Sequence, residues 1–191
     1  MLETTEYSPE TNGPVSIDRA TVDDAMGIVE IRRQCWLETY PNEAEGFTYE
    51  DVRRRVEGEH GEGIDQTIQR WRYGISSEDG INRQTLVARA NGKIIGFASP
   101  LKERGKYHLG ALYVLPEAQH KGVGRNLLRA AIDWYGRDKD IYLQVVSYNT
   151  NAIAFYEKHG FRKSGKPVNS SVRPFPNGKS FPEIEMVLKA C

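Results

Sequence analysis

PEAQHKGVGRNLL (residues 116–128) begins as a polar turn and ends as the first turns of an amphipathic helix. Gly122 and Gly124 stand where this helix begins, although glycine destabilises a helix by roughly 1 kcal/mol relative to alanine. Free N–H groups at a helix N-terminus form an anion site, and glycine lets the anion approach the backbone. Lys121 and Arg125 add positive charge beside the turn. The stretch therefore predicts either a phosphate-binding turn or, more simply, a tight turn that needs glycine for its geometry.

Two well-defined phosphate-binding patterns are absent from the chain. No GxxxxGK[ST] sequence occurs, so the turn is not a Walker loop, and the three-glycine dinucleotide pattern is missing as well. A mononucleotide or a pyrophosphate remains as the expected ligand of a phosphate-binding turn.

The residues on either side of the turn alternate between strand and helix patterns. Asn91-Gly92 joins two apolar runs and is the strongest hairpin signal in the chain, while Thr21 and Asp24 are typical of a capped helix start. Strands are expected at 15–20, 85–90, 93–100, 107–115, 141–147, 161–165 and 183–190, and helices at 21–40, 64–73, 123–135 and 151–159, with a further turn or two at 49–56. This order predicts a mixed α/β domain whose helices cover one sheet.

Length and charge narrow the class of protein. The 191 residues suit one domain, which we expect at 15–191 behind a flexible tail at 1–14. Lys plus Arg equal Asp plus Glu at 26 each, so no global charge favours nucleic acid. No apolar run approaches the ~20 residues that span a bilayer, and the polar, acidic first residues are unlike a signal peptide. We therefore expect a cytoplasmic protein that binds neither nucleic acid nor a membrane.

Cysteine and histidine spacing argues against a disulfide and a metal site. Cys35 falls inside a helical pattern and Cys191 is the last residue, so no structural disulfide is expected. The four histidines form no HxxxH pair, and the two cysteines form no CxxC pair, so no metal site is expected.

Two motifs resemble those of one enzyme family. QHKGVG (119–124) is similar to the Q/R-x-x-G-x-G/A acetyl-CoA signature of the GNAT N-acetyltransferases, and the preceding LYVLP resembles the usual end of their fourth strand. Residues 149–161 match the second signature of that family, N-x-x-A-x-x-x-Y-x-x-x-G-F. Two signatures in the right structural context are more specific than one. The resemblance covers roughly residues 15–190 and includes the order of elements.

The resemblance implies a fold and a ligand. The GNAT fold is a mixed sheet of about seven strands, splayed between the fourth and fifth strands and flanked by about four helices. The pantetheine arm of acetyl-CoA would lie between 107–115 and 140–147 like an extra strand, and the pyrophosphate would rest on the amides of 119–125. The residues that the resemblance implies in acetyl-CoA binding are Leu112, Tyr113, Val114, Gln119, His120, Lys121, Gly122, Val123, Gly124, Arg125, Asn149 and Asn151.

Amide formation from a thioester poses two proton problems. An alkylamine with a pKa of about 10 must lose a proton before it attacks, and a proton donor helps a thiolate, whose parent pKa is about 8.5, to leave. Family members usually let the amine attack acetyl-CoA directly. Tyr156 stands where the family has its general acid, so the resemblance implies that role; the alternative is a core tyrosine on an amphipathic helix.

The general base is open among several residues. His108 occupies the position on the fourth strand where the histone-acetylating branch has a glutamate, and imidazole suits proton abstraction near neutral pH. Strand alternation predicts one face for His108, Gly110, Leu112 and Val114. The alternatives are a partly exposed polar histidine without a catalytic role, and a base supplied by 38–40, either Glu38 or Tyr40, directly or through water.

The acceptor is expected to be a primary amine. We expect two segments to shape its pocket in this fold: 42–65, which is acidic, and the loop at 166–182. The acidic segment is either a solvated surface or, if it lines the cleft, a site for a cationic acceptor such as a polyamine, an aminoglycoside or a peptide amine. WLETY (36–40) resembles a short W-x-x-T-Y stretch of bacterial polyamine acetyltransferases.

Two functions from different classes fit these observations. The first is an acetyl-CoA-dependent N-acetyltransferase acting on a small amine or a peptide amine, which Tyr156 and the glycine turn favour. The second is a non-catalytic acyl-CoA-binding module of the same fold, which the missing carboxylate at His108 favours. Homodimers are frequent in the family, so the resemblance also makes a homodimer an expected assembly.

Overall fold

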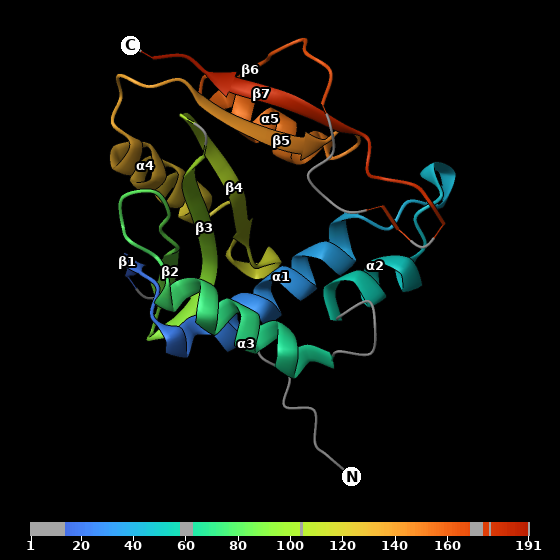
Figure 1. The fold of residues 1–191 in the computed structure, drawn as a ribbon, viewed down its shortest axis with the longest axis horizontal. Helices are drawn as coiled ribbons and strands as arrows, with labels where there is room; N and C mark the ends of the chain where they lie inside the picture. Colours follow the sequence, from blue (N-terminus) through green and yellow to red (C-terminus); the bar gives the residue numbers. More distant parts are fainter. Residues whose placement is uncertain (1–13, 58–62, 104, 169–173, 176, 191) are drawn as a thin grey trace.

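The chain forms one mixed sheet with helices on both faces, shown in Figure 1 for the computed structural model. The structure describes residues 14–57, 63–103, 105–168, 174–175 and 177–190, so the predicted tail apart from Pro14 lies outside it, as does Cys191. In sheet order the strands are β1 (Val15–Arg19), β2 (Leu86–Ala90), β3 (Lys93–Glu103), β4 (Lys106–Val114), β5 (Ile141–Val146), β7 (Glu183–Leu188) and β6 (Arg162–Lys163). The α-helices are α1 (Ala25–Thr39), α2 (Tyr49–Glu57), α3 (Gly63–Ser76), α4 (Val123–Tyr135) and α5 (Thr150–Lys158).

Two local predictions about turns are confirmed. Asn91 and Gly92 join β2 to β3 with positive φ angles of 50° and 76°, as a two-residue hairpin turn requires. Thr21 and Asp24 form the predicted capping box, in which Thr21 N donates to Asp24 Oδ2 at 2.8 Å ahead of α1. The seven-stranded mixed sheet is confirmed as well, and the predicted extra turns at 49–56 are the full helix α2.

Helices cover the two faces of the sheet with different partners. On one face, Trp71 of α3 packs its ring edge against Phe97 of β3, with ring centroids 5.5 Å apart. On the other face, Leu127 of α4 lies over Gly96, the neighbour of Phe97. Successive residues of a strand point to opposite faces. The face under α1 and α3 is therefore opposite to the face under α4.

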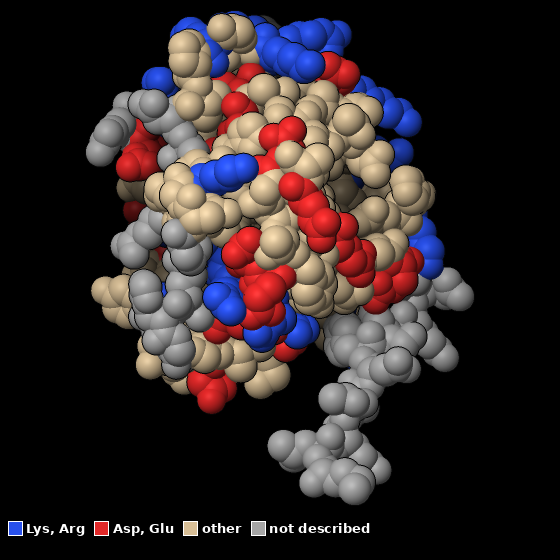
Figure 2. All heavy atoms as spheres, turned by 90° about the vertical axis from the view of Figure 1, so that its right-hand side faces the viewer, with Lys and Arg blue, Asp and Glu red and all other residues tan. Residues whose placement is uncertain are grey.

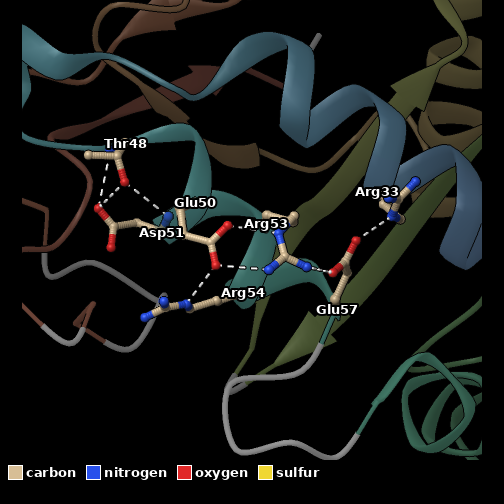
Figure 3. A network of polar contacts seen from close by, with 7 residues as sticks. All are labelled: Arg33, Thr48, Glu50, Asp51, Arg53, Arg54 and Glu57. Carbon is tan, nitrogen blue, oxygen red and sulfur yellow. Dashed lines mark hydrogen bonds and ion pairs between the residues drawn. The ribbon is translucent and has the colours of Figure 1, made fainter.

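Ion pairs connect α1 to α2 (Figure 3). Arg33 of α1 donates from Nε to Glu57 Oε1 of α2 at 2.8 Å, and Arg53 also pairs with Glu57. Arg53 and Arg54 both pair with Glu50, which lies three and four positions before them in α2. Two acidic residues of the 42–65 segment, Glu50 and Glu57, are thus paired with arginines of α1 and α2.

A second, smaller apolar cluster lies beside α1 and α2. Its buried residues are Trp36, Phe47, Val52, Val56, Val146, Phe175 and Phe181. Two hydrogen bonds connect residues before β7 to the stretch between α1 and α2. Asn177 Nδ2 donates to Gly46 O at 3.0 Å, and Lys179 Nζ donates to Glu45 O at 3.1 Å. The segment before β7 is therefore held against α2 and the end of α1.

The sheet opens between β4 and β5. These parallel strands are in register only at Tyr107↔Ile141 and His108↔Tyr142 among the described residues. Beyond His108 the two strands diverge, and Figure 1 shows β5 and β7 turned away from the line of β4. The splay that the resemblance implies is confirmed.

A β-bulge in β4 corrects one prediction. Ala98 of β3 pairs with Leu112 but Pro100 pairs with Leu109, so β4 carries one extra residue between these pairs. His108 lies before the bulge, and Gly110 lies within it. Both are on the α1 face of the sheet, where a Cβ on Gly110 would meet Leu101 at 2.7 Å. Val114 lies on the α4 face, beside Gly124.

The single face predicted for His108, Gly110, Leu112 and Val114 is therefore wrong. The extra residue shifts the alternation by one, so the last residues of β4 point to the face opposite His108. Separately, none of the described helices is long and apolar enough to cross a membrane.

Candidate active site

The splay between β4 and β5 contains a cleft with a volume of about 1590 Å³. Its walls come from the end of α1, the length of β4, the turn before α4, the end of β5, α5 and the start of β7. The cleft brings together the following predicted residues: His108, Leu112, Tyr113, Val114, Gln119, His120, Lys121, Gly122, Gly124, Arg125, Asn149, Asn151 and Tyr156. Val123 does not line the cleft, because its side chain is buried in the main core under α4.

The glycine turn has two glycines with different structural requirements. Gly122 is the N-cap of α4 and has φ +83°, a left-handed conformation that favours glycine. Gly124 is helical, and a Cβ there would make ordinary contact with Phe155 at 3.5 Å. The left-handed backbone therefore accounts for a glycine at 122. The helical backbone at 124 accepts any residue, so it does not account for a glycine there.

The first amides of α4 have no partner within the helix. The helical hydrogen bonds begin with Asn126 N donating to Gly122 O, so the N–H groups of 123–125 precede the ladder. Lys121 and Arg125 are exposed beside them on the cleft. Gln119 differs from a simple ligand residue, because its Nε2 donates to Val114 O at 3.1 Å and so connects the turn to the end of β4.

Asn149 and Asn151 stand where α5 begins. Asn149 is the N-cap of α5, and its Oδ1 accepts a hydrogen bond from Ala152 N at 3.1 Å. Asn151 is exposed and lines the cleft. Asn149 thus fixes the join between β5 and α5.

Tyr156 lies at the wall of the cleft with its ring in the main core. The residue is 8% exposed, and its ring packs against Phe155 and Phe161. Burial raises the pKa of Tyr156 above its usual value of 10, so the phenol is protonated at neutral pH. No hydrogen bond to its hydroxyl occurs within the described part of the chain, and the proton is available to a group in the cleft.

His108 lies at the closed end of the cleft, where β4 and β5 are still paired. Its ring is 5.9 Å from the ring of Tyr142, and its carbonyl oxygen accepts a hydrogen bond from the Tyr135 hydroxyl. Burial, and then the neighbouring charge of Lys106, lower the pKa of His108 below its usual 6.5. The imidazole is therefore neutral at pH 7 and can accept a proton.

Three aromatic side chains connect the end of α1 to β4. Trp36 Nε1 donates to the Tyr113 hydroxyl at 2.8 Å, and the hydroxyls of Tyr113 and Tyr40 are 3.4 Å apart. Burial raises the pKa of Tyr40 well above 10, so its hydroxyl is protonated at neutral pH. Glu38, the other predicted alternative, is exposed on the same wall of the cleft.

The acidic segment at 42–65 is not the source of the negative charge in the cleft. None of its described residues lines the cleft, and its Glu50 and Glu57 are paired with arginines. The carboxylates that line the cleft are instead those of Glu38, Glu103 and Glu183. Glu183 had no sequence signal, since it reaches the cleft only through the pairing of β7 with β5.

Charge is separated within the cleft. The basic lining residues near the turn and on α5 are His120, Lys121, Arg125, Lys158 and His159. The carboxylates come from α1, β3 and β7. Figure 2 views the molecule from the side that carries α2, and acidic side chains gather in the middle and lower part of this face. Among the described residues, no group of three or more potential metal ligands occurs.

Comparison with solved structures identifies the class of fold. The PaiA N-acetyltransferase from Thermoplasma acidophilum, solved in complex with coenzyme A, matches with a TM-score of 0.72 and 22% identity, over 92% of this chain and 99% of that one. The splayed sheet with a glycine turn beside it is thus the fold of a known acetyltransferase. The model of the acetyltransferase (GNAT) family matches residues 28–161, and the chain belongs to that family. The resemblance drawn from the two signatures is confirmed.

Curated relatives of the chain carry different acceptor names. The N-alpha-acetyltransferase RimI of Mycobacterium tuberculosis is 34% identical over 83 residues, 41% of this chain and 51% of its own length. The spermidine N(1)-acetyltransferase of Thermoplasma acidophilum is 26% identical over 152 residues, 78% of this chain and 88% of its own. The chain spans about half the length of the first curated relatives that it matches, between 51% and 58%.

Proposed function

We propose that this protein is an acetyl-CoA-dependent N-acetyltransferase that acetylates a primary amine. The observation that carries the proposal is the opening of the sheet beside the N-terminus of α4. Beyond His108, the edge of β4 that faces β5 has no partner strand among the described residues. An extended pantetheine arm can add to such an edge by backbone hydrogen bonds, here to 112–114.

The turn before α4 fits the phosphates of the same ligand. The amides of 123–125, Lys121 and Arg125 present donors and positive charge at one end of the cleft. Relatives support this ligand, because the Thermoplasma PaiA enzyme was solved with coenzyme A and the YncA protein of Salmonella typhimurium with acetyl-CoA. A structural role of Gly122 and a phosphate-binding role of the turn are compatible, since the same bare backbone serves both.

The acetyl group then passes to the amine in one displacement. The amine nitrogen forms a bond to the carbonyl carbon, the carbon–sulfur bond breaks, the nitrogen loses a proton and the thiolate gains one. Tyr156 is our candidate for the donor to sulfur, because its hydroxyl is protonated and the residue lines the cleft. His108 is our candidate for the base, because its lowered pKa leaves the imidazole neutral at pH 7. A water chain to Glu38 is the alternative route for the amine proton.

The test measures binding and turnover separately. CoA or acetyl-CoA should raise the melting temperature, since a ligand that binds only the folded state stabilises it. Release of free thiol from acetyl-CoA in the presence of a panel of amines should then exceed release without an amine. A CoA-dependent shift without amine-dependent thiol release would favour the non-catalytic module, and no shift at all would contradict both functions.

Two further expectations belong to the same proposal. A homodimer and a cytoplasmic location stay predictions. Light scattering behind a size-exclusion column measures the first, and fractionation of the source cells measures the second.

A further inference from the structure

The acidic wall of the cleft also carries aromatic side chains, and together they form what we call the acceptor pocket: Glu38, Tyr40, Tyr148, Phe181 and Glu183. All five residues line the cleft. They come from the end of α1, the residues after β5 and the start of β7. We propose that this pocket binds a linear alkyl diamine, so that one amine is acetylated while the second, charged amine is held in the pocket. The proposal rests on the proposed function and names the substrate class of the same site.

The aromatic wall is rigid. The ring centroids of Tyr40 and Phe181 are 5.1 Å apart, and Phe181 also packs against Phe47 at 4.7 Å. Tyr148 donates its hydroxyl to Tyr40 O at 2.9 Å, which fixes the residues after β5 on the end of α1. Such a wall suits methylene groups by apolar contact and an ammonium group by its ring faces.

Trp36 is already occupied by a cation of the protein itself. The guanidinium of Arg32 lies 4.3 Å from the ring centroid of Trp36. Arg32 does not line the cleft, and it covers Trp36 from the α1 side. The rings that remain for a ligand are therefore those of Tyr40, Tyr148 and Phe181.

The Tyr40 hydroxyl is only partly satisfied. The Tyr113 hydroxyl accepts from Trp36 Nε1, and it lies at a long distance of 3.4 Å from the Tyr40 hydroxyl, where either oxygen can be the donor. The Tyr40 hydroxyl has no other hydrogen bond in the described residues. Burial raises the pKa of Tyr40, so this hydroxyl is protonated at neutral pH. A polar group in such a place gains from a ligand that hydrogen bonds to it.

Charge selects between possible ligands of the pocket. Glu38 and Glu183 flank the aromatic wall, two residues before Tyr40 and two residues after Phe181. The basic lining residues lie on the turn and α5, apart from His108, which is neutral at pH 7. An acceptor with a second positive charge is therefore favoured over one with a neutral end, and an acceptor with a carboxylate is disfavoured.

Three four-carbon acceptors with different ends test this selection: putrescine, n-butylamine and γ-aminobutyrate. With the native chain and saturating acetyl-CoA, we expect kcat/KM for putrescine to exceed that for n-butylamine about tenfold, the value of one charge-assisted contact. γ-Aminobutyrate should be the poorest acceptor. Equal kcat/KM values for putrescine and n-butylamine would overturn the proposal.

Two substitutions show whether the pocket causes the preference. Glu38→Gln and Glu183→Gln should each lower kcat/KM for putrescine several-fold more than they lower kcat/KM for n-butylamine. Glu30→Gln is the matched control, since it removes the same charge from an exposed position of α1 outside the cleft. An equal loss for both amines would assign these carboxylates to another role.

A binding measurement tests the same preference in case no amine is turned over. Calorimetry on the CoA-saturated protein should show tighter binding of putrescine than of n-butylamine, and Glu183→Gln should remove the difference. Failure of the proposed function would appear as no CoA-dependent stabilisation or no thiol release with any amine. Failure of the diamine proposal would appear as amine binding or turnover without a preference for the second charge.

Discussion

Trp36 Nε1 donates a hydrogen bond to the Tyr113 hydroxyl across 2.8 Å, and this bond joins the end of α1 to the strand that lines the cleft. Trp36 is buried, so an indole N–H without an acceptor would remain out of contact with water. We expect Tyr113→Phe to lower the free energy of unfolding by about 1–3 kcal/mol for this reason. Denaturant unfolding measures the change, and Tyr73→Phe, at a residue 77% exposed, should change stability little.

Removal of the Tyr156 hydroxyl should affect catalysis and leave folding intact. The hydroxyl has no partner within the described residues, and phenylalanine keeps the ring contacts with Phe155 and Phe161. Tyr156→Phe should therefore lower kcat far more than it raises KM for acetyl-CoA, while the melting temperature stays close to that of the parent. Unchanged kcat under conditions where chemistry limits the rate would reassign Tyr156 to packing.

The two glycines of the turn should respond differently to substitution. Gly122→Val places a branched side chain at φ +83°, so a loss of CoA binding there would be mixed with strain. Gly124→Ala adds a methyl group with ordinary contacts and should not lower stability, since alanine favours the helix. We expect Gly124→Ala, and more strongly Gly124→Val, to weaken the CoA-dependent thermal shift. Normal CoA binding by both Gly124 variants would show that the ligand does not approach this residue.

The pH dependence of activity tests His108 as the base. Its pKa is lowered, so kcat/KM should rise through a limb centred below pH 6.5 and be level at neutral pH. His108→Ala should remove this limb and lower kcat/KM by about 10²- to 10⁴-fold, the usual contribution of a positioned base. A pH–rate profile of the variant that overlays that of the parent would direct attention to Glu38.

The same shift affects stability with a defined sign. Because the folded pKa of His108 lies below the unfolded value of about 6.5, the unfolded chain binds more protons in this range. The stability contributed by the neutral imidazole is complete above pH 6.5 and is lost as the pH falls through the folded pKa. His108→Gln should reduce this acid destabilisation, which unfolding curves at pH 7 and pH 5 compare directly.

Much of the fold followed from short-range chemistry in the sequence. Asn91-Gly92 needs two left-handed residues, and Thr21 with Asp24 makes a local reciprocal bond, so neighbours alone decide both. The glycine turn and the 149–161 signature located the cleft in another way, through their resemblance to the GNAT signatures.

The remaining features depend on contacts between distant residues. The bulge in β4 is a mismatch between two paired strands, so His108 alone gave no sign that it faces away from Val114. Phe181 and Glu183 enter the acceptor pocket because β7 pairs with β5 and because Asn177 and Lys179 bond to 45–46. The acidic residues of 42–65 drew attention by their number, but none of those described lines the cleft, and Glu50 and Glu57 pair with arginines.

The predicted boundary of the domain is also open to experiment. β1 begins at Val15 and pairs with β2 from Val15↔Ala90 onward. A chain that starts at Pro14 should therefore keep the complete sheet, the melting temperature and the CoA-dependent shift. A clear loss of stability in this shortened chain would assign residues 1–13 to the fold.

The two register pairs between β4 and β5 have a consequence for how the molecule opens. The β5–β7–β6 ribbon with α5 pairs by backbone with the larger part of the sheet, β1–β4, only at Tyr107 and His108 among the described residues, and its other contacts are side-chain packing in the main core and in the aromatic cluster at Phe181. Local opening of the ribbon should therefore need less free energy than global unfolding, and its amides should exchange with deuterium earlier. A ligand bound along β4 would contact both parts of the sheet. Their amides should then exchange with deuterium together, in one cooperative unfolding event.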